Sequence, residues 1–218
     1  MESKYVVFDG MDGSGKGTQM ELLKKELGSH VVFTREPGGT MFAEEIRKLV
    51  RDNQLASRST PLNNFLLFWA AREELMQNLV MPTLRSGKHV FSDRGDSSTF
   101  AFQLYGEDRE ELFGVFVLMR KLIFAEDSGR RQPDLYIVFD LSAEVARKRV
   151  MNDNERTKNH FDVRDIGYYE RVRNGFLKFA SYYPVKFVDA TRTPEQIHRD
   201  VMMILAAEMI VPEYAFVV

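Results

Sequence analysis

The stretch GMDGSGKGT, residues 10–18, decides the fold of the chain. Its glycines allow successive backbone N–H groups to turn toward a bound anion, and its lysine adds a full positive charge. The loop lies between an apolar run, YVVFD at 5–9, and a run with helical spacing, TQMELLKKELG at 18–28. A strand, a glycine loop and a helix in this order predict a site for nucleotide phosphates. The predicted nucleotide-binding residues are Gly10, Met11, Asp12, Gly13, Ser14, Gly15, Lys16, Gly17 and Thr18.

The residue after the lysine departs from the usual pattern. Loops of this kind carry a serine or threonine there, whose hydroxyl binds Mg²⁺ between the terminal phosphates, whereas this chain has Gly17. The metal must therefore take oxygen ligands from elsewhere. We predict Thr18, one position later, and Asp93, at the end of the apolar run HVFSD, as metal ligands. The alternative for Asp93 is a structural cap at the end of a strand.

Four further apolar runs resemble buried strands: HVVFTR at 30–35, KHVFSDR at 88–94, PDLYIVFDL at 133–141 and VKFVDA at 185–190. Helical segments separate them, which is typical of parallel strands covered on both faces. The sequence therefore predicts a three-layer α/β/α fold with a central five-stranded parallel sheet, and a ligand site at the carboxyl ends of its strands. The helix around 62–80 should end or kink near Pro82, and the last helix should begin at Thr193 with a capping box.

Composition limits the class of protein. The 218 residues, 44% hydrophobic and 28% charged, fit one globular domain over 1–218. A net charge of −2 argues against a nucleic-acid partner. The chain has no cysteine, and its first residues lack the apolar stretch of a secretory signal, so we expect a cytoplasmic protein.

Three segments stand apart from this pattern. The apolar run LFGVFVLMRKLIF at 112–124 is too short and too interrupted to span a membrane. It must bury more than one helical face, either in the core or in a homodimer, and composition does not separate the two. The polar segment 149–167 predicts a mobile lid, and the apolar tail at 206–218 has no predicted role.

Arginines recur at the ends of predicted strands and in loops. They are Arg35, Arg72, Arg94, Arg149, Arg156 and Arg164. Transfer of a phosphoryl group between two nucleotides crowds negative charges that such guanidinium groups offset. The chain lacks an N-K-x-D guanine-binding motif, so a switch GTPase is disfavoured. These residues favour a small-molecule kinase.

Four further motifs make the chain resemble a known family. TREPGGT at 34–40, FWAAR at 68–72, SDRGDSSTFAFQ at 92–103 and PDLYIVFDL follow the glycine loop in the order and spacing of thymidylate kinases. The resemblance covers roughly residues 4–205. It implies the P-loop NTPase fold of nucleoside monophosphate kinases, an acceptor-binding region at 35–72, and phosphoryl transfer from ATP to dTMP with Mg²⁺, giving dTDP and ADP.

The resemblance also implies roles for single residues. Arg35 would hold the dTMP phosphate, Phe68 would stack on thymine, and Arg72 would donate to its O4. Arg94 would bridge the two sets of phosphates, and Asp12 would help to place the acceptor. The remaining implied substrate-binding residues, from the SSTFAFQ motif, are Ser98, Thr99, Phe102 and Gln103.

The phosphate loop itself contains no arginine, so the resemblance implies one supplied by the lid. Arg149 or Arg156 is predicted, which completes a catalytic set with Lys16, Arg94 and Asp12. Two departures from the family remain: GKGT resembles adenylate kinases, and Gly95 replaces the usual aromatic or histidine after DR. The alternatives are a kinase for dUMP, dCMP or AMP, and a nucleotide-dependent switch or binding module.

Overall fold

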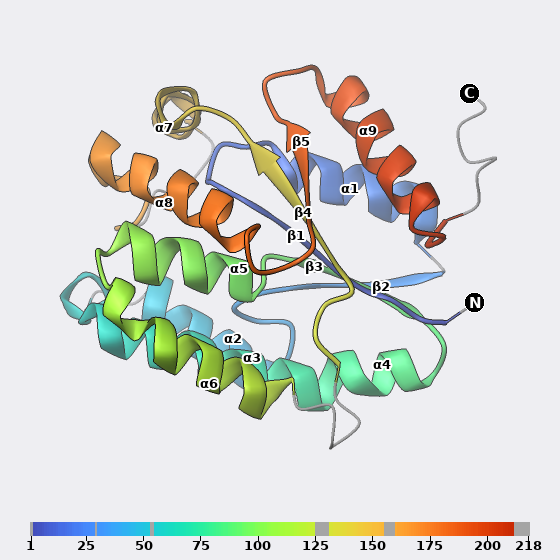
Figure 1. Cartoon of the computed structure of the whole chain (residues 1–218), viewed down its shortest axis with the longest axis horizontal. Coiled ribbons are helices and arrows are strands. Elements are labelled where there is room, and N and C mark those ends of the chain that lie inside the picture. The colour runs from blue at the N-terminus through green and yellow to red at the C-terminus, as the bar shows by residue number, and fades with distance from the viewer. Residues whose placement is uncertain (1, 29, 53–54, 125–130, 155–159, 212–218) are drawn as a thin grey trace.

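Five parallel strands form the centre of the molecule (Figure 1). The computed structural model describes residues 2–28, 30–52, 55–124, 131–154 and 160–211. The strands are β1 (Tyr5–Gly10), β2 (Val31–Arg35), β3 (His89–Asp93), β4 (Leu135–Asp140) and β5 (Val185–Asp189), in the spatial order β2-β3-β1-β4-β5. Every pairing is parallel, so the predicted sheet is confirmed.

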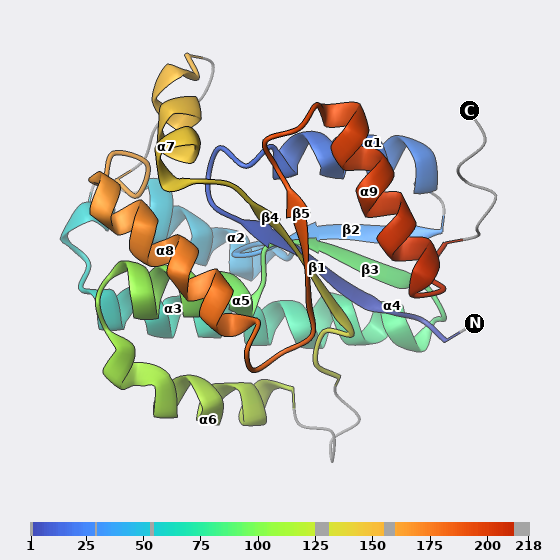
Figure 2. The ribbon, with the colours of Figure 1, turned by 45° about the horizontal axis from the view of Figure 1, so that its top comes forward.

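Helices cover both faces of this sheet, as Figures 1 and 2 show. Helices α1 (Lys16–Leu27) and α9 (Pro194–Ala207) lie on one face. The other face carries α3 (Pro61–Leu75), α4 (Met81–Arg85) and α6 (Phe113–Ile123). The remaining helices are α2 (Met41–Arg47), α5 (Asp96–Ser98), α7 (Ala143–Asn152) and α8 (Ile166–Phe179), with π-helical segments η1 (Lys48–Asp52), η3 (Met76–Val80) and η4 (Thr99–Gly106) and 3₁₀ turns η2 (Ala56–Arg58) and η5 (Glu110–Leu112). The predicted three-layer fold is confirmed.

The first four residues of strand β1, 5–8, are all apolar because both faces of the strand are covered. Its alternating side chains enter two different cores, because successive residues of a strand point to opposite faces. Val6 and Phe8 join the core that contains Leu23 of α1. Tyr5 and Val7 join the core that contains Trp69 of α3. Both faces are buried, so no position in the strand tolerates a solvated side chain.

Two local signals were predicted near helix ends. At Pro82 the helical run does not end: it changes from the π-helical segment η3 to α4 at Met81 and continues past the proline to Arg85. Thr193 caps α9, and the reciprocal contacts with Gln196 form the expected capping box.

Helix α2 and the following segment η1 bury fewer apolar side chains than their helical spacing predicts. The spacing predicts that Phe42, Ile46, Leu49 and Val50 point inward, but Phe42 and Leu49 are exposed. Ile46 and Val50 do pack inward, together with Ala71 of α3. Among the described residues, α3 is the main helical neighbour of α2, and the chain passes into η1 at Lys48, so a single narrow face is covered.

The lid and the tail are described in part. Residues 155–159 of the lid and 212–218 of the tail lie outside the described residues. Within the tail, Ile210 and Val211 pack into the core beside α9. The described helices include none with the length and apolarity that a membrane span requires.

Candidate active site

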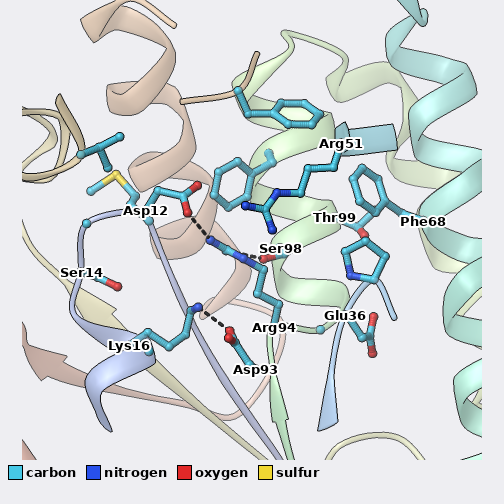
Figure 3. Close-up of a pocket in the computed structure, with 18 of the residues that line it drawn as sticks. Asp12, Ser14, Lys16, Glu36, Arg51, Phe68, Asp93, Arg94, Ser98 and Thr99 are labelled. Atoms are coloured by element: carbon cyan, nitrogen blue, oxygen red, sulfur yellow. Dashed lines mark hydrogen bonds and ion pairs between the residues drawn. The ribbon is translucent and has the colours of Figure 1, made fainter. Parts of the chain in front are cut away.

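A cavity of about 560 Å³ opens where β1 and β3 end, and Figure 3 shows the side chains that surround it. Residues 11–18 form one wall, and Phe68 and Arg72 of α3 form the opposite wall. The floor contains 93–95 and, from the following helical turns, Ser98, Thr99, Phe102 and Gln103. The structure therefore brings the nucleotide-binding loop and most of the implied acceptor-binding residues to one site.

The glycine loop is shaped by close approach to two other elements. A Cβ atom on Gly10 would lie 2.7 Å from the carbonyl oxygen of Phe139, and one on Gly13 would lie 2.5 Å from that of Ala146. Both residues also have positive φ, which glycine adopts without strain. Gly15 then caps α1, so the backbone N–H groups of its first turn remain available to an anion.

Lys16 is held by Asp93 in this structure. Its Nζ donates a hydrogen bond to Oδ1 of Asp93, and the lysine is buried. Burial acts to raise the pKa of Asp93, but the opposite charges of Lys16 and Arg94 outweigh it and hold that pKa below its ordinary value. Asp93 is therefore an ionised carboxylate that keeps Lys16 beside the loop.

Arg94 lies between the loop and the opposite wall of Phe68 and Arg72, the acceptor wall (Figure 3). Its Nη2 donates to Asp12 at 3.0 Å, and its Nη1 donates to the Gly10 carbonyl at 3.0 Å and to Ser98 at 3.0 Å. Its guanidinium also stacks 5.0 Å from the ring of Phe102. Burial would lower the pKa of Arg94, but the neighbouring aspartates raise it, so the group stays charged.

Asp9, which the sequence did not lead us to predict as a site residue, holds Arg94 in place by a hydrogen bond. The Asp9 carboxylate is fully buried and accepts hydrogen bonds from Arg94, Ser97 and Ser98 at 3.2, 2.6 and 2.7 Å. Arg94 itself has φ of 74°, a strained conformation for a residue with a side chain. Such strain at a cavity wall, held by several hydrogen bonds, is typical of a functional position.

The acceptor wall carries Phe68 and Arg72, one helical turn apart on α3. Arg72 is only 2% exposed, and its Nη2 donates to Thr99 at 3.0 Å. Figure 3 shows Phe68 beside Thr99. An aromatic face next to fixed donors suits a planar base with polar edges.

Arg35 lies apart from the other predicted site residues. It is about half exposed and forms an ion pair with Glu44 at 3.0 Å, and it is not part of the described cavity lining. Arg47 and Arg51, which we did not predict, line the cavity instead, and Figure 3 shows Arg51 extending over it. Burial and the nearby Arg51 and Arg35 lower the pKa of Arg47 to about 10. The i, i+4 spacing of Arg47 and Arg51 in EEIRKLVR puts both on one helical face, and this pattern could have indicated them as site residues.

The predicted lid arginines have different positions. Arg149 lines the cavity and donates to the backbone carbonyls of Gly13 and Ala190 at 3.3 and 2.9 Å. Arg164 pairs with Glu107 at 2.7 Å, away from the described cavity lining. Arg156 lies outside the described residues.

The oxygen atoms at the loop suit a hard divalent cation. Asp12, Thr18 and Asp93 all line the cavity, and carboxylate and hydroxyl oxygens are the ligands that Mg²⁺ prefers. The described residues contain no group of three or more metal-binding side chains of the His, Cys, Asp and Glu types.

Gly17 and Gly95, the two departures from the family pattern, have different surroundings. A Cβ atom on Gly17 would meet nothing within 4 Å, so a side chain fits there. A Cβ atom on Gly95 would lie 2.9 Å from the side chain of Val7, so a larger residue would displace this part of the cavity floor.

A parallel sheet with a glycine loop, its lysine and converging arginines at the carboxyl edge defines a P-loop protein of the phosphotransferase kind. A family model described as thymidylate kinase matches residues 8–201. Thymidylate kinases of Pelotomaculum thermopropionicum and Chlorobium chlorochromatii are 36% and 35% identical to the chain, covering 93% and 90% of it and 92% and 91% of the relatives. The crystal structure of thymidylate kinase from Ehrlichia chaffeensis superposes with a TM-score of 0.74 at 28% identity, covering 94% of this chain and 99% of that one. The chain belongs to the thymidylate kinase family.

Proposed function

We propose that the protein transfers the γ-phosphate of ATP to dTMP, giving dTDP and ADP. Besides family membership, one observation carries the proposal. Arg94 is hydrogen-bonded both to Asp12 of the phosphate loop and to Ser98 in the cavity floor beside the acceptor wall. A fixed cation between two binding walls of one cavity suits the developing charge of a phosphoryl group in transit.

The two walls have separate tasks in this proposal. Residues 11–18 bind the phosphates of ATP through backbone N–H groups, and Lys16 leaves Asp93 to contact them. On the acceptor side of the cavity, Phe68 stacks on thymine while Arg72 of the wall and Thr99 and Gln103 of the floor bind its polar edge. Phe102 excludes a ribose 2′-hydroxyl. No general base is needed, because a phosphate monoester is already largely ionised near pH 7, so catalysis consists of positioning and charge neutralisation.

Several residues supply positive charge near the phosphoryl group that is transferred. Arg149, which contacts the loop at Gly13, is the described lid arginine for this task, and Arg156 remains a prediction. Asp93 and Thr18 would hold Mg²⁺, which neutralises charge on the phosphates when bound. Arg35 would bind the dTMP phosphate after its ion pair with Glu44 opens, and Arg47 lies in the cavity as a second cation for the same phosphate.

The proposed assembly is a homodimer through α6. This helix buries Phe116, Arg120 and Ile123 against its own chain. Its opposite face exposes the apolar side chains of Leu118 (54%) and Leu122 (58%). An apolar face on a helix that is otherwise packed favours contact with a second copy. The lack of cysteine suits a reducing compartment, and we propose a cytoplasmic location.

The proposed function is tested by a coupled ADP-release assay with dTMP, dUMP, dCMP and AMP at equal concentrations. We expect the highest kcat/KM with dTMP, and a loss of turnover in the Lys16→Ala variant. Equal turnover with all four nucleotides would favour a general monophosphate kinase. ADP release that is independent of any acceptor would favour a hydrolytic switch.

A further inference from the structure

A carboxylate that we did not predict is buried directly behind Arg72. Glu36, just after β2, is 5% exposed, and Arg72 is 2% exposed. The Nε atom of Arg72 donates to Oε2 of Glu36 at 2.7 Å. A buried, charge-assisted hydrogen bond of this length holds a guanidinium far more firmly than a solvated ion pair does.

Glu36 is itself anchored to the sheet. Its Oε1 accepts from the hydroxyl of Tyr5 in β1 at 3.2 Å, and its backbone N–H donates to the carbonyl of Asp93 at 2.9 Å. Burial raises the pKa of Tyr5 well above its ordinary value, so this phenol remains a donor. Glu36 is therefore a rigid support with one oxygen for Tyr5 and the other for Arg72.

The guanidinium of Arg72 is fixed on its other sides as well. Its Nη2 donates to Thr99, and its Cζ atom lies 4.4 Å from the centroid of the Trp69 ring. Its Nη1 is buried and has no hydrogen-bond acceptor among the described residues. A buried donor without an acceptor is costly, and Arg72 lines the cavity. A ligand oxygen can reach this nitrogen only when the cavity wall opens on binding.

We propose that Glu36, supported by Tyr5, is the positioning residue that orients Arg72 to select a pyrimidine with a carbonyl oxygen at position 4. The inference rests on the proposed function and extends it to the choice of base. Thymine and uracil present an acceptor at that position, whereas cytosine presents an amino donor. A guanidinium held by Glu36 directs its own N–H donors at the cytosine amino group and so disfavours dCMP. A guanidinium released from Glu36 can turn aside and tolerate that amino group.

The first test compares dTMP with dCMP in the Glu36→Gln variant. We expect the ratio of kcat/KM for dTMP over dCMP to fall by about tenfold or more, mainly through a higher KM for dTMP. Tyr5→Phe keeps the carboxylate and removes one support, so the ratio should fall less. Glu73→Gln makes the same chemical change beside Arg72 on α3 and should leave the ratio unchanged within about twofold. An equal loss of kcat/KM for both nucleotides in Glu36→Gln would overturn the proposal.

The second test needs no substrate. The Nε–H group of Arg72 should give a sharp, slowly exchanging ¹H–¹⁵N resonance in the wild-type protein and in Glu73→Gln. In Glu36→Gln this resonance should broaden or exchange with solvent, and in Tyr5→Phe it should shift. An unchanged Arg72 resonance in both Glu36→Gln and Tyr5→Phe would refute the positioning role. Failure of the wild-type protein to phosphorylate dTMP would instead refute the proposed function, and the resonance would still decide whether Glu36 orients Arg72.

Discussion

The replacement Asp9→Asn tests the network that holds Arg94. The Asp9 carboxylate is fully buried, and its Oδ1 accepts from the Gly10 N–H at 2.9 Å, from Arg94 and from Ser98, while its Oδ2 accepts from Ser97. Asparagine keeps the size of the side chain but puts an amide nitrogen in place of one oxygen. An amide nitrogen at the Oδ1 position would face the donors of Gly10 and Arg94, and in either orientation Arg94 loses a buried counter-charge.

The magnitude follows from these contacts. Removing one partner of a buried ion pair costs about 3–5 kcal/mol of unfolding free energy. Arg94 keeps its contact with Asp12, so we expect the lower end, about 3 kcal/mol. For a chain of this size, this corresponds to a fall in Tm of roughly 6–12 °C. Displacement of Arg94 by about 1 Å should also lower kcat about 100-fold.

Asp12→Asn is the matched control. Asp12 also pairs with Arg94, but its side chain is 20% exposed, so water partly replaces the lost contact. We expect a stability loss below about 1 kcal/mol together with a lower kcat. Denaturant titrations and the ADP-release assay measure both quantities. An Asp9→Asn variant as stable as the wild type, or equal destabilisation of the two variants, would refute the reasoning.

Three further predictions concern pH, the metal and assembly. The kcat/KM for dTMP should fall below about pH 6, where the acceptor phosphate gains a proton. Burial opposes ionisation of Asp93, but Lys16 and Arg94 hold its pKa below the ordinary value. The stability from its ionised form is thus present above the unfolded pKa and lost only as pH falls through the lower folded pKa. An Asp93-dependent stability step between pH 5 and 7, absent from Asp93→Asn, would contradict this. Gly17→Ser should fold normally and lower the Mg²⁺ concentration needed for half-maximal rate about twofold or more, because its side chain meets no atom and adds a hydroxyl ligand; an unchanged Mg²⁺ titration would argue against this. Leu118→Lys should convert the dimer to a monomer in sedimentation equilibrium, whereas Leu177→Lys, at an exposed leucine of α8, should not, and a monomeric wild-type protein would refute the assembly.

Much of the fold follows from local sequence. Runs such as YVVF and LYIVF are apolar at every position because both faces of their strands are covered. The glycine loop is recognisable because its backbone must turn toward an anion and approach Phe139 and Ala146 closely. These requirements involve short segments, so their residue patterns were sufficient to predict them.

The rest depends on contacts between distant segments. Asp9 meets Ser97 across 88 positions, and Glu36 meets Arg72 across 36, so no local spacing indicated either pair. Acidic residues at the end of apolar strands also occur as simple caps. Phe42 and Leu49 follow helical spacing but stay exposed, because periodicity does not reveal how many neighbours cover a helix. Arg35 lies in the motif TREPGGT, but its side chain pairs with Glu44 and does not line the described cavity, which the motif alone did not indicate.

The central claim is that two nucleotides exchange a phosphoryl group across Arg94. It is tested most directly by incubating the protein with Mg²⁺, dTMP and ATP labelled in its γ-phosphate, and separating the products. The account predicts that the label appears in dTDP, and that this transfer falls about 100-fold or more in Arg94→Lys. Label that stays in ATP, or appears only as inorganic phosphate, would contradict it.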